Sequence, residues 1–162
     1  MNDRIEKVDH SALRVNQAMI IVLLIAAFVV DAVGLVAVVA LAMFVGTALR
    51  QPGFKWVYAR FLEPRGIVKP DVIEDNLQPH VFAQGLGATF LAAGVVAFLL
   101  NTPVIGWGLT WLVVALAALN LFIGFCVGCF VYYWLSRMRV PGFVAQPIPG
   151  AFPGMRPSGR AN

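Results

Sequence analysis

The chain is organised as long apolar runs separated by short polar segments. Residues 15–30 form the first run, and Asp31 separates it from a second run that ends at residue 49. One helix through both runs would be about 52 Å long and would place Asp31 near the centre of a hydrocarbon core of about 30 Å, at a cost of about 3 kcal/mol. The pattern therefore predicts a hairpin that turns at Asp31 and joins transmembrane helices at residues 15–30 and 33–49.

Two further apolar runs follow a polar loop. Residues 80–100 carry no formal charge unless His80 is protonated, and residues 105–135 follow a short turn. The last run would form about 46 Å of helix, so it must tilt, protrude or kink, and Gly124 is the expected kink. The four runs predict an all-α membrane protein. Its membrane domain, residues 15–136, would be a four-transmembrane-helix bundle built as two helical hairpins.

The segments outside the helices differ in composition. Residues 54–62 mix aromatic with basic side chains, which favours an amphipathic segment in the headgroup layer. Residues 137–162 hold half of the ten prolines of the chain and are predicted to be disordered. Residues 1–14 are rich in charge. No small-residue cleavage site follows the first apolar run, so we expect that run to remain as an anchor.

Composition and charge placement support a bilayer environment. Hydrophobic residues make up 60% of the chain and charged residues only 12%, whereas soluble domains carry about 25% charged residues. All 12 lysines and arginines fall on one side of the four-crossing arrangement, and none lies in either outer turn. By the positive-inside rule, both termini and the long loop are predicted to be cytoplasmic, with the helices in the plasma (inner) membrane. We attribute the net charge of +4 to the lipid surface and predict no nucleic-acid partner.

The two cysteines, Cys126 and Cys129, form a Cys-Val-Gly-Cys motif in the fourth run. On a helix their Cα atoms would lie about 5 Å apart, which is within the range of a disulfide. The motif is consistent with a thiol–disulfide couple or a persulfide carrier in the cytoplasmic half of the membrane. It is equally consistent with two small residues packed in a helix, because free cysteine is often buried as a hydrophobe.

Polar side chains near the cytoplasmic helix ends are expected either to line a shallow vestibule leading to the thiols or to cap helices and snorkel. An apolar site disfavours the thiolate, so a reactive thiol here would need a positive or polar neighbour. The candidates for this support are Arg14, Asn16, Gln17, His80, Gln84 and Tyr133.

A metal site at the thiols carries less weight. His80 and His10 could join the thiols around zinc, but a closed zinc site needs four ligands and nothing in the sequence fixes the histidines near the thiols. We therefore predict no metal and no cofactor. Gly124 and Gly128 form a GxxxG motif with Asn120 one turn earlier, and this stripe is predicted to pack helices, with Asn120 hydrogen-bonded to another helix.

Several stretches resemble a family of small bacterial integral membrane proteins described as a domain of unknown function, DUF4395. The resemblance spans about residues 8–137 and implies a fold and a membrane location but no activity. It also implies sulfur metabolism with a soluble thioredoxin-like or rhodanese-like partner. The matching stretches are residues 9–17, 52–56, 68–71, 79–85 and 120–129.

The sequence leaves three functions open, and with them the question of whether the protein is an enzyme. The first is thiol–disulfide redox or sulfur-relay chemistry at Cys126 and Cys129. The second is a non-catalytic membrane subunit or scaffold, in which the loop at residues 51–79 and the tail dock another protein. The third is a carrier of small solutes or sulfur compounds. The GxxxG motif permits a homodimer or a larger membrane complex.

Overall fold

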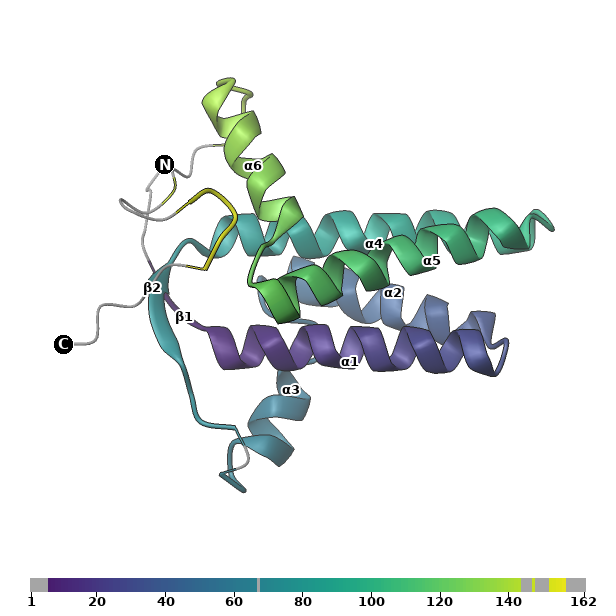
Figure 1. The fold of residues 1–162 in the computed structure, drawn as a ribbon, viewed down its shortest axis with the longest axis horizontal. Helices are drawn as coiled ribbons and strands as arrows, with labels where there is room; N and C mark the ends of the chain where they lie inside the picture. Colours follow the sequence, from purple (N-terminus) through teal and green to yellow (C-terminus); the bar gives the residue numbers. More distant parts are fainter. Residues whose placement is uncertain (1–5, 67, 144–146, 148–151, 157–162) are drawn as a thin grey trace.

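Four long helices lie lengthwise beside one another (Figure 1). α1 packs against α2 and α5, and α4 also packs against α2 and α5, so the four helices close a ring. The ring helices are α1 (His10–Val29), α2 (Val33–Ala48), α4 (Leu77–Leu99) and α5 (Pro103–Ala118). The computed structural model describes residues 6–66, 68–143, 147 and 152–156.

Three helices are long and apolar enough to cross a membrane. They are α1, α4 and the continuous helix Pro103–Ile123, and α2 is a shorter apolar helix beside them. The buried core of the ring is made of small and medium side chains such as Ala27, Val36 and Leu91. Large apolar side chains, including Leu41 and Val96, point outward and are exposed. An apolar outer surface of this kind suits lipid, which confirms the prediction of a mostly helical membrane protein.

Both connections at one end of the ring are tight turns (Figure 1). Asp31 follows α1 with φ of 50°, and Asn101 follows α4 with φ of 57°. Short side chains that can hydrogen-bond locally tolerate this left-handed conformation better than other non-glycine residues. The polar residue at each break therefore allows the chain to reverse within three residues.

A small sheet lies at the opposite end of the ring (Figure 1). β1 (Glu6–Asp9) pairs antiparallel with β2 (Val72–Asp75). Asp9 then caps α1, because its carboxylate accepts the backbone N–H of Ser11 at 2.9 Å. α1 consequently begins at His10, five residues before the predicted start, and α4 begins at Leu77 rather than at His80.

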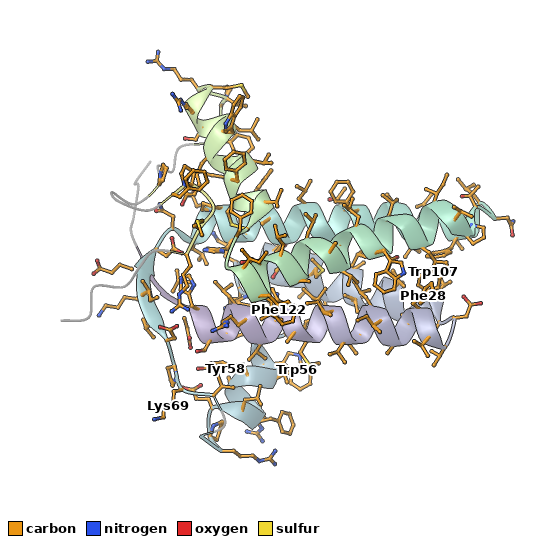
Figure 2. The ribbon with its side chains drawn as sticks, in the orientation of Figure 1. Phe28, Trp56, Tyr58, Lys69, Trp107 and Phe122 are labelled. Atoms are coloured by element: carbon orange, nitrogen blue, oxygen red, sulfur yellow. A yellow bond between two sulfur atoms is a disulfide. The ribbon has the colours of Figure 1, made fainter. Side chains whose placement is uncertain are left out.

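A short helical arm, α3 (Lys55–Val57) followed by η1 (Tyr58–Leu62), projects away from the ring in the segment predicted to be interfacial (Figure 1). Trp56 is exposed, whereas Tyr58 is buried beside the ring (Figure 2). Burial, with a smaller contribution from Asp9, raises the pKa of Tyr58 to about 12. The arm thus presents aromatic and basic side chains outward, while the buried side chain of Tyr58 packs against the ring.

The fourth apolar run is broken, so the predicted single helix over residues 105–135 is wrong. α5 continues through a π-helical turn, η2 (Leu119–Ile123), and ends at Gly124, which has φ of 74°. Glycine adopts this conformation without steric cost. A separate helix, α6 (Val127–Arg137), then leaves the ring at a steep angle (Figure 1). The expected kink at Gly124 is therefore a complete break.

The tail also departs from the prediction where it is described. Residues 152–156 pair with the break after α5 through an antiparallel bridge between Met155 and Phe125. Most of the remaining tail, residues 144–146, 148–151 and 157–162, lies outside the described residues.

Candidate functional site

Cys126 and Cys129 form a disulfide at the start of α6. Their Cα atoms are 5.2 Å apart, close to the distance that the motif predicted. The break after η2 makes Cys126 the N-cap of α6, and its Sγ accepts the backbone N–H of Cys129 at 3.2 Å. Because a helix N-terminus stabilises negative charge, this position favours the thiolate of Cys126 once the disulfide is reduced.

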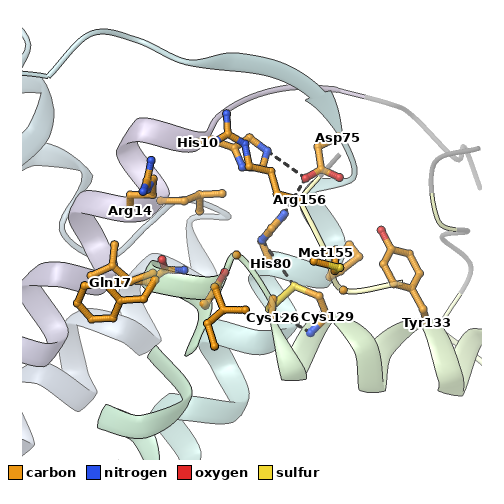
Figure 3. Close-up of a pocket in the computed structure, with 18 residues that line it drawn as sticks. His10, Arg14, Gln17, Asp75, His80, Cys126, Cys129, Tyr133, Met155 and Arg156 are labelled. Atoms are coloured by element: carbon orange, nitrogen blue, oxygen red, sulfur yellow. Dashed lines mark hydrogen bonds and ion pairs between the residues drawn. A yellow bond between two sulfur atoms is a disulfide. The ribbon is translucent and has the colours of Figure 1, made fainter. Parts of the chain in front are cut away.

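His80, near the start of α4, links the disulfide to a buried carboxylate (Figure 3). Its Nδ1 lies 3.6 Å from Sγ of Cys129, and its Nε2 lies 3.0 Å from Oδ2 of Asp75. We assign the ring proton to Nε2, which faces the carboxylate, and this leaves the Nδ1 lone pair toward the sulfur. His80 can therefore accept the proton of a reduced Cys129.

Asp75 is the electrostatic centre of the site. It is buried, and its Oδ2 also lies 3.1 Å from Nε2 of His10. Its Oδ1 accepts the backbone N–H of Asn76 at 2.7 Å. Burial alone would raise the pKa of Asp75, but hydrogen bonding to His10 and His80 outweighs burial and holds the pKa well below its usual range. Asp75 is consequently ionised at neutral pH and orients the imidazole of His80.

We predict that Asp75→Asn lowers the free energy of unfolding by about 1–3 kcal/mol at pH 7, because it removes a charged acceptor from the buried imidazole of His10 and the half-buried imidazole of His80. A depressed native-state pKa contributes stability that is complete above the ordinary value of 3.8 and is lost as the pH falls below it. Equilibrium unfolding in detergent micelles should therefore show a difference between wild type and variant that shrinks as the pH falls from about 5 toward about 2. Glu74→Gln, at an exposed neighbouring carboxylate, is the control. A difference that does not change with pH would contradict this account.

Two cavities meet at the disulfide. One, of about 330 Å³, lies between the sheet, the starts of α1 and α4, and the described tail, and both cysteines line it. The other, of about 390 Å³, is apolar and lies among α1, α4, α5 and α6, where Cys126 but not Cys129 lines it. Cys126 thus stands between the more polar first cavity and the apolar second one, whereas Cys129 lines the first and not the second.

Two of the predicted supporting residues, Gln17 and His80, line both cavities. Arg14, Gln17, His80 and Tyr133 line the polar cavity with the disulfide (Figure 3). Asn16 and Gln84 border the apolar cavity and hold the chain that precedes the helical arm. Asn16 accepts the backbone N–H of Phe54 at 2.9 Å. The side-chain amide of Gln84 donates to the carbonyls of Met43 and Gln51, each at 3.1 Å.

The break also divides the predicted GxxxG stripe. Gly128 packs tightly on α4, since a Cβ placed there would lie 2.5 Å from Cβ of Ala83. Gly124 serves the turn instead, and a Cβ there would meet only Arg156, at 4.0 Å. Asn120 borders both cavities, beside Cys126. Of the three residues in the stripe, Gly128 therefore packs against α4, Gly124 forms the turn, and Asn120 belongs to the site.

Sets of possible metal ligands overlap at His80. The atoms of His80, Cys126 and Cys129 lie within 4.8 Å of one another, as do those of His10, Asp75 and His80. Each set offers three ligands, whereas closed zinc sites use four. In the oxidised pair the sulfurs are bonded to each other, and both imidazole Nε2 atoms already face Asp75. The expectation of a metal-free site stays a prediction.

Sequence reasoning missed Asp75 and the described tail segment, and it considered His10 only as a zinc ligand. Asp75 belongs to the polar loop at residues 51–79 and stands five residues before His80, just ahead of a long apolar run. A carboxylate at that position is within reach of the start of the following helix. The Pro153-Gly154 pair was an available turn signal in the tail.

Comparison with known proteins identifies the family. The model of DUF4395, a domain of unknown function, matches residues 8–137. The chain belongs to this family. The match includes the ring helices, both cysteines and His80 but ends before residues 152–156. No curated protein and no solved structure matches this DUF4395 chain.

Proposed function

We propose that this DUF4395 protein is a membrane thiol–disulfide exchange protein that uses Cys126 and Cys129 for redox or sulfur-relay chemistry. One observation carries the proposal. A disulfide that begins a helix is placed against an imidazole that a buried carboxylate orients, with Nδ1 of His80 lying 3.6 Å from Sγ of Cys129. Two inert packed cysteines would have no need of that arrangement.

Cys126 is the attacking thiol in this scheme, because it caps α6 and accepts the N–H of Cys129. Its thiolate attacks a partner disulfide, forming a mixed disulfide and releasing one partner thiolate. His80 then takes the proton of Cys129, whose sulfur attacks Sγ of Cys126 and re-forms the internal disulfide. The second partner sulfur leaves and receives the proton, so two electrons pass from the cysteine pair to the partner. With a partner persulfide, the thiolate of Cys126 would instead attack the outer sulfur, which forms a persulfide on Cys126 and releases the partner thiolate.

We further propose that α2 also crosses the bilayer, which makes four crossings with the site on the cytoplasmic side. α2 has 16 residues, about 24 Å of helix, and local thinning can accommodate that length. The two outer turns carry no lysine or arginine, whereas basic residues flank the other helix ends. This orientation gives a soluble thioredoxin-like or rhodanese-like protein access to the polar cavity.

The test measures the state and accessibility of the cysteine pair in its membrane. We expect a maleimide to label the cysteines only after mild reduction, and a membrane-impermeant maleimide to label inside-out vesicles but not intact cells. Exchange with a soluble dithiol should be about 100-fold slower in His80→Ala, because the proton acceptor is lost. Thr89→Ala, on the same helix, is the control, since its hydroxyl bonds only to the carbonyl of Gly85.

The proposal fails if the pair resists both mild reduction and mild oxidation, or if His80→Ala exchanges at the wild-type rate. Labelling of intact cells would instead overturn the cytoplasmic orientation and leave the exchange chemistry standing.

A further inference from the structure

The tail segment Phe152–Arg156 forms a tight turn against the disulfide. The backbone N–H of Met155 donates to the carbonyl of Phe152 at 2.9 Å, and Gly154 has φ of 84°. Proline at the second position and a left-handed glycine at the third are the signature of a type II turn. The sequence therefore encodes a defined shape for this short segment, although the surrounding tail is rich in proline and glycine.

This segment pairs with the backbone on the N-terminal side of the disulfide. The N–H of Cys126 donates to the carbonyl of Gly154 at 2.8 Å, and the N–H of Arg156 donates to the carbonyl of Gly124 at 3.2 Å. These two bonds flank the antiparallel bridge between Phe125 and Met155. The break after η2 thus exposes a short backbone edge that pairs with the last three residues of this segment.

Side chains set a pattern along the bound segment. A Cβ at Gly154 would lie 2.9 Å from the carbonyl oxygen of Cys126 and 2.9 Å from Cβ of Phe130, so this position admits only glycine. The ring of Phe152 stacks on that of Phe130, with centroids 6.3 Å apart. Arg156 forms an ion pair with Asp71. The edge therefore favours a peptide that carries an aromatic residue, a glycine two positions later and a basic residue two positions after the glycine.

The contact is shallow enough to be displaced. Phe152 and Met155 remain 59% and 46% exposed, and the ion pair of Arg156 is partly open to solvent. The segment also lies beyond the part of the chain that matches the family. A tethered segment of this kind competes with free peptides at an effective concentration of about millimolar.

From this geometry we infer that the backbone edge Gly124–Cys126 is a binding site for a turn-forming peptide segment of the exchange partner, and that the chain's own residues 152–156 occupy the site and can be displaced from it. The chemistry of exchange rests on the proposed function, whereas the peptide site does not. A partner segment bound in this way would lie beside Sγ of Cys126, where its own sulfur could form the mixed disulfide. The partner class is consequently a protein with a turn-forming segment that ends in a basic residue, rather than a free small thiol.

The experiment uses the full chain in lipid nanodiscs. Gly154→Val should release the segment and speed maleimide labelling of reduced Cys126 by about tenfold or more, because two hydrogen bonds and an ion pair no longer hold it. A synthetic Phe-Pro-Gly-Met-Arg peptide at millimolar concentration should restore slow labelling of this variant. The same peptide with valine in place of glycine should not. Arg139→Ala, at an exposed arginine outside the segment, should label as wild type.

A second readout is independent of sulfur chemistry. Fluorescence anisotropy of the dye-labelled glycine peptide should show binding to Gly154→Val and weaker binding to wild type. Equal labelling rates in wild type and Gly154→Val, or equal behaviour of the two peptides, would overturn the inference while leaving thiol exchange intact. Peptide binding by a chain whose cysteines never exchange would support the peptide site and overturn the proposed function alone.

Discussion

A Cys129→Ser variant is expected to accumulate a covalent complex with its exchange partner, linked through Cys126. The reason is geometric, because Cys126 caps α6 and is the thiol whose charge the helix terminus favours. Without Cys129 the mixed disulfide loses its intramolecular attacking group, and we expect its release to slow by at least about 1,000-fold. Non-reducing electrophoresis followed by mass spectrometry of the linked peptides measures the result.

Cys126→Ser is the matched control and should trap little partner, because its remaining thiol, Cys129, lies against His80 and does not cap α6. Trapping mainly through Cys129 in that variant would reverse the assigned roles. Comparable trapping in both variants would show that neither thiol is preferred and would remove the basis for helix-terminus activation.

A Gly128→Ala substitution is expected to displace α6 from α4. The added Cβ would lie 2.5 Å from Cβ and 2.8 Å from Cα of Ala83, and the backbone atom cannot give way locally. We expect a loss of about 1–3 kcal/mol in the free energy of unfolding. We also expect slower thiol exchange, because the shift separates Cys129 from His80. Unfolding in micelles and the exchange rate are measured on the same preparation.

Gly108→Ala on α5 is the control for this experiment, since a Cβ there meets nothing within 4 Å. Alanine is the better helix former, so this variant should be neutral or slightly more stable than wild type. If the two substitutions have the same effect, helix propensity rather than the contact between α4 and α6 determines the response.

Hydrophobic patterning predicted the ring helices because burial in lipid acts on whole runs of residues. The turns at Asp31 and Asn101 could be predicted for the same reason, because each polar residue interrupts an apolar run. At Gly124 the sequence predicted a kink but not the complete break. The residues on both sides of it are apolar, so a change of direction there leaves the hydropathy of the run unchanged.

The site itself depended on contacts between distant residues. Sequence reasoning proposed His80 as a neighbour of the thiols from its position at a helix end, and the structure places it there. The pairing of β1 with β2 joins segments more than 60 residues apart, and no local pattern reports it. That pairing brings Asp75 to His10 and His80, which explains why a carboxylate of the polar loop is buried.

The position of α6 outside the ring has a consequence for how the protein can vary. None of the described residues of α6 belongs to the hydrophobic cluster at the centre of the ring. The ring helices, which are apolar enough to face lipid, and α6, which carries Cys129, are thus built from different residues and are joined at the break before Cys126. Changes that adapt the outer surface to a thicker or thinner membrane can therefore accumulate without retuning the reactivity of the sulfurs.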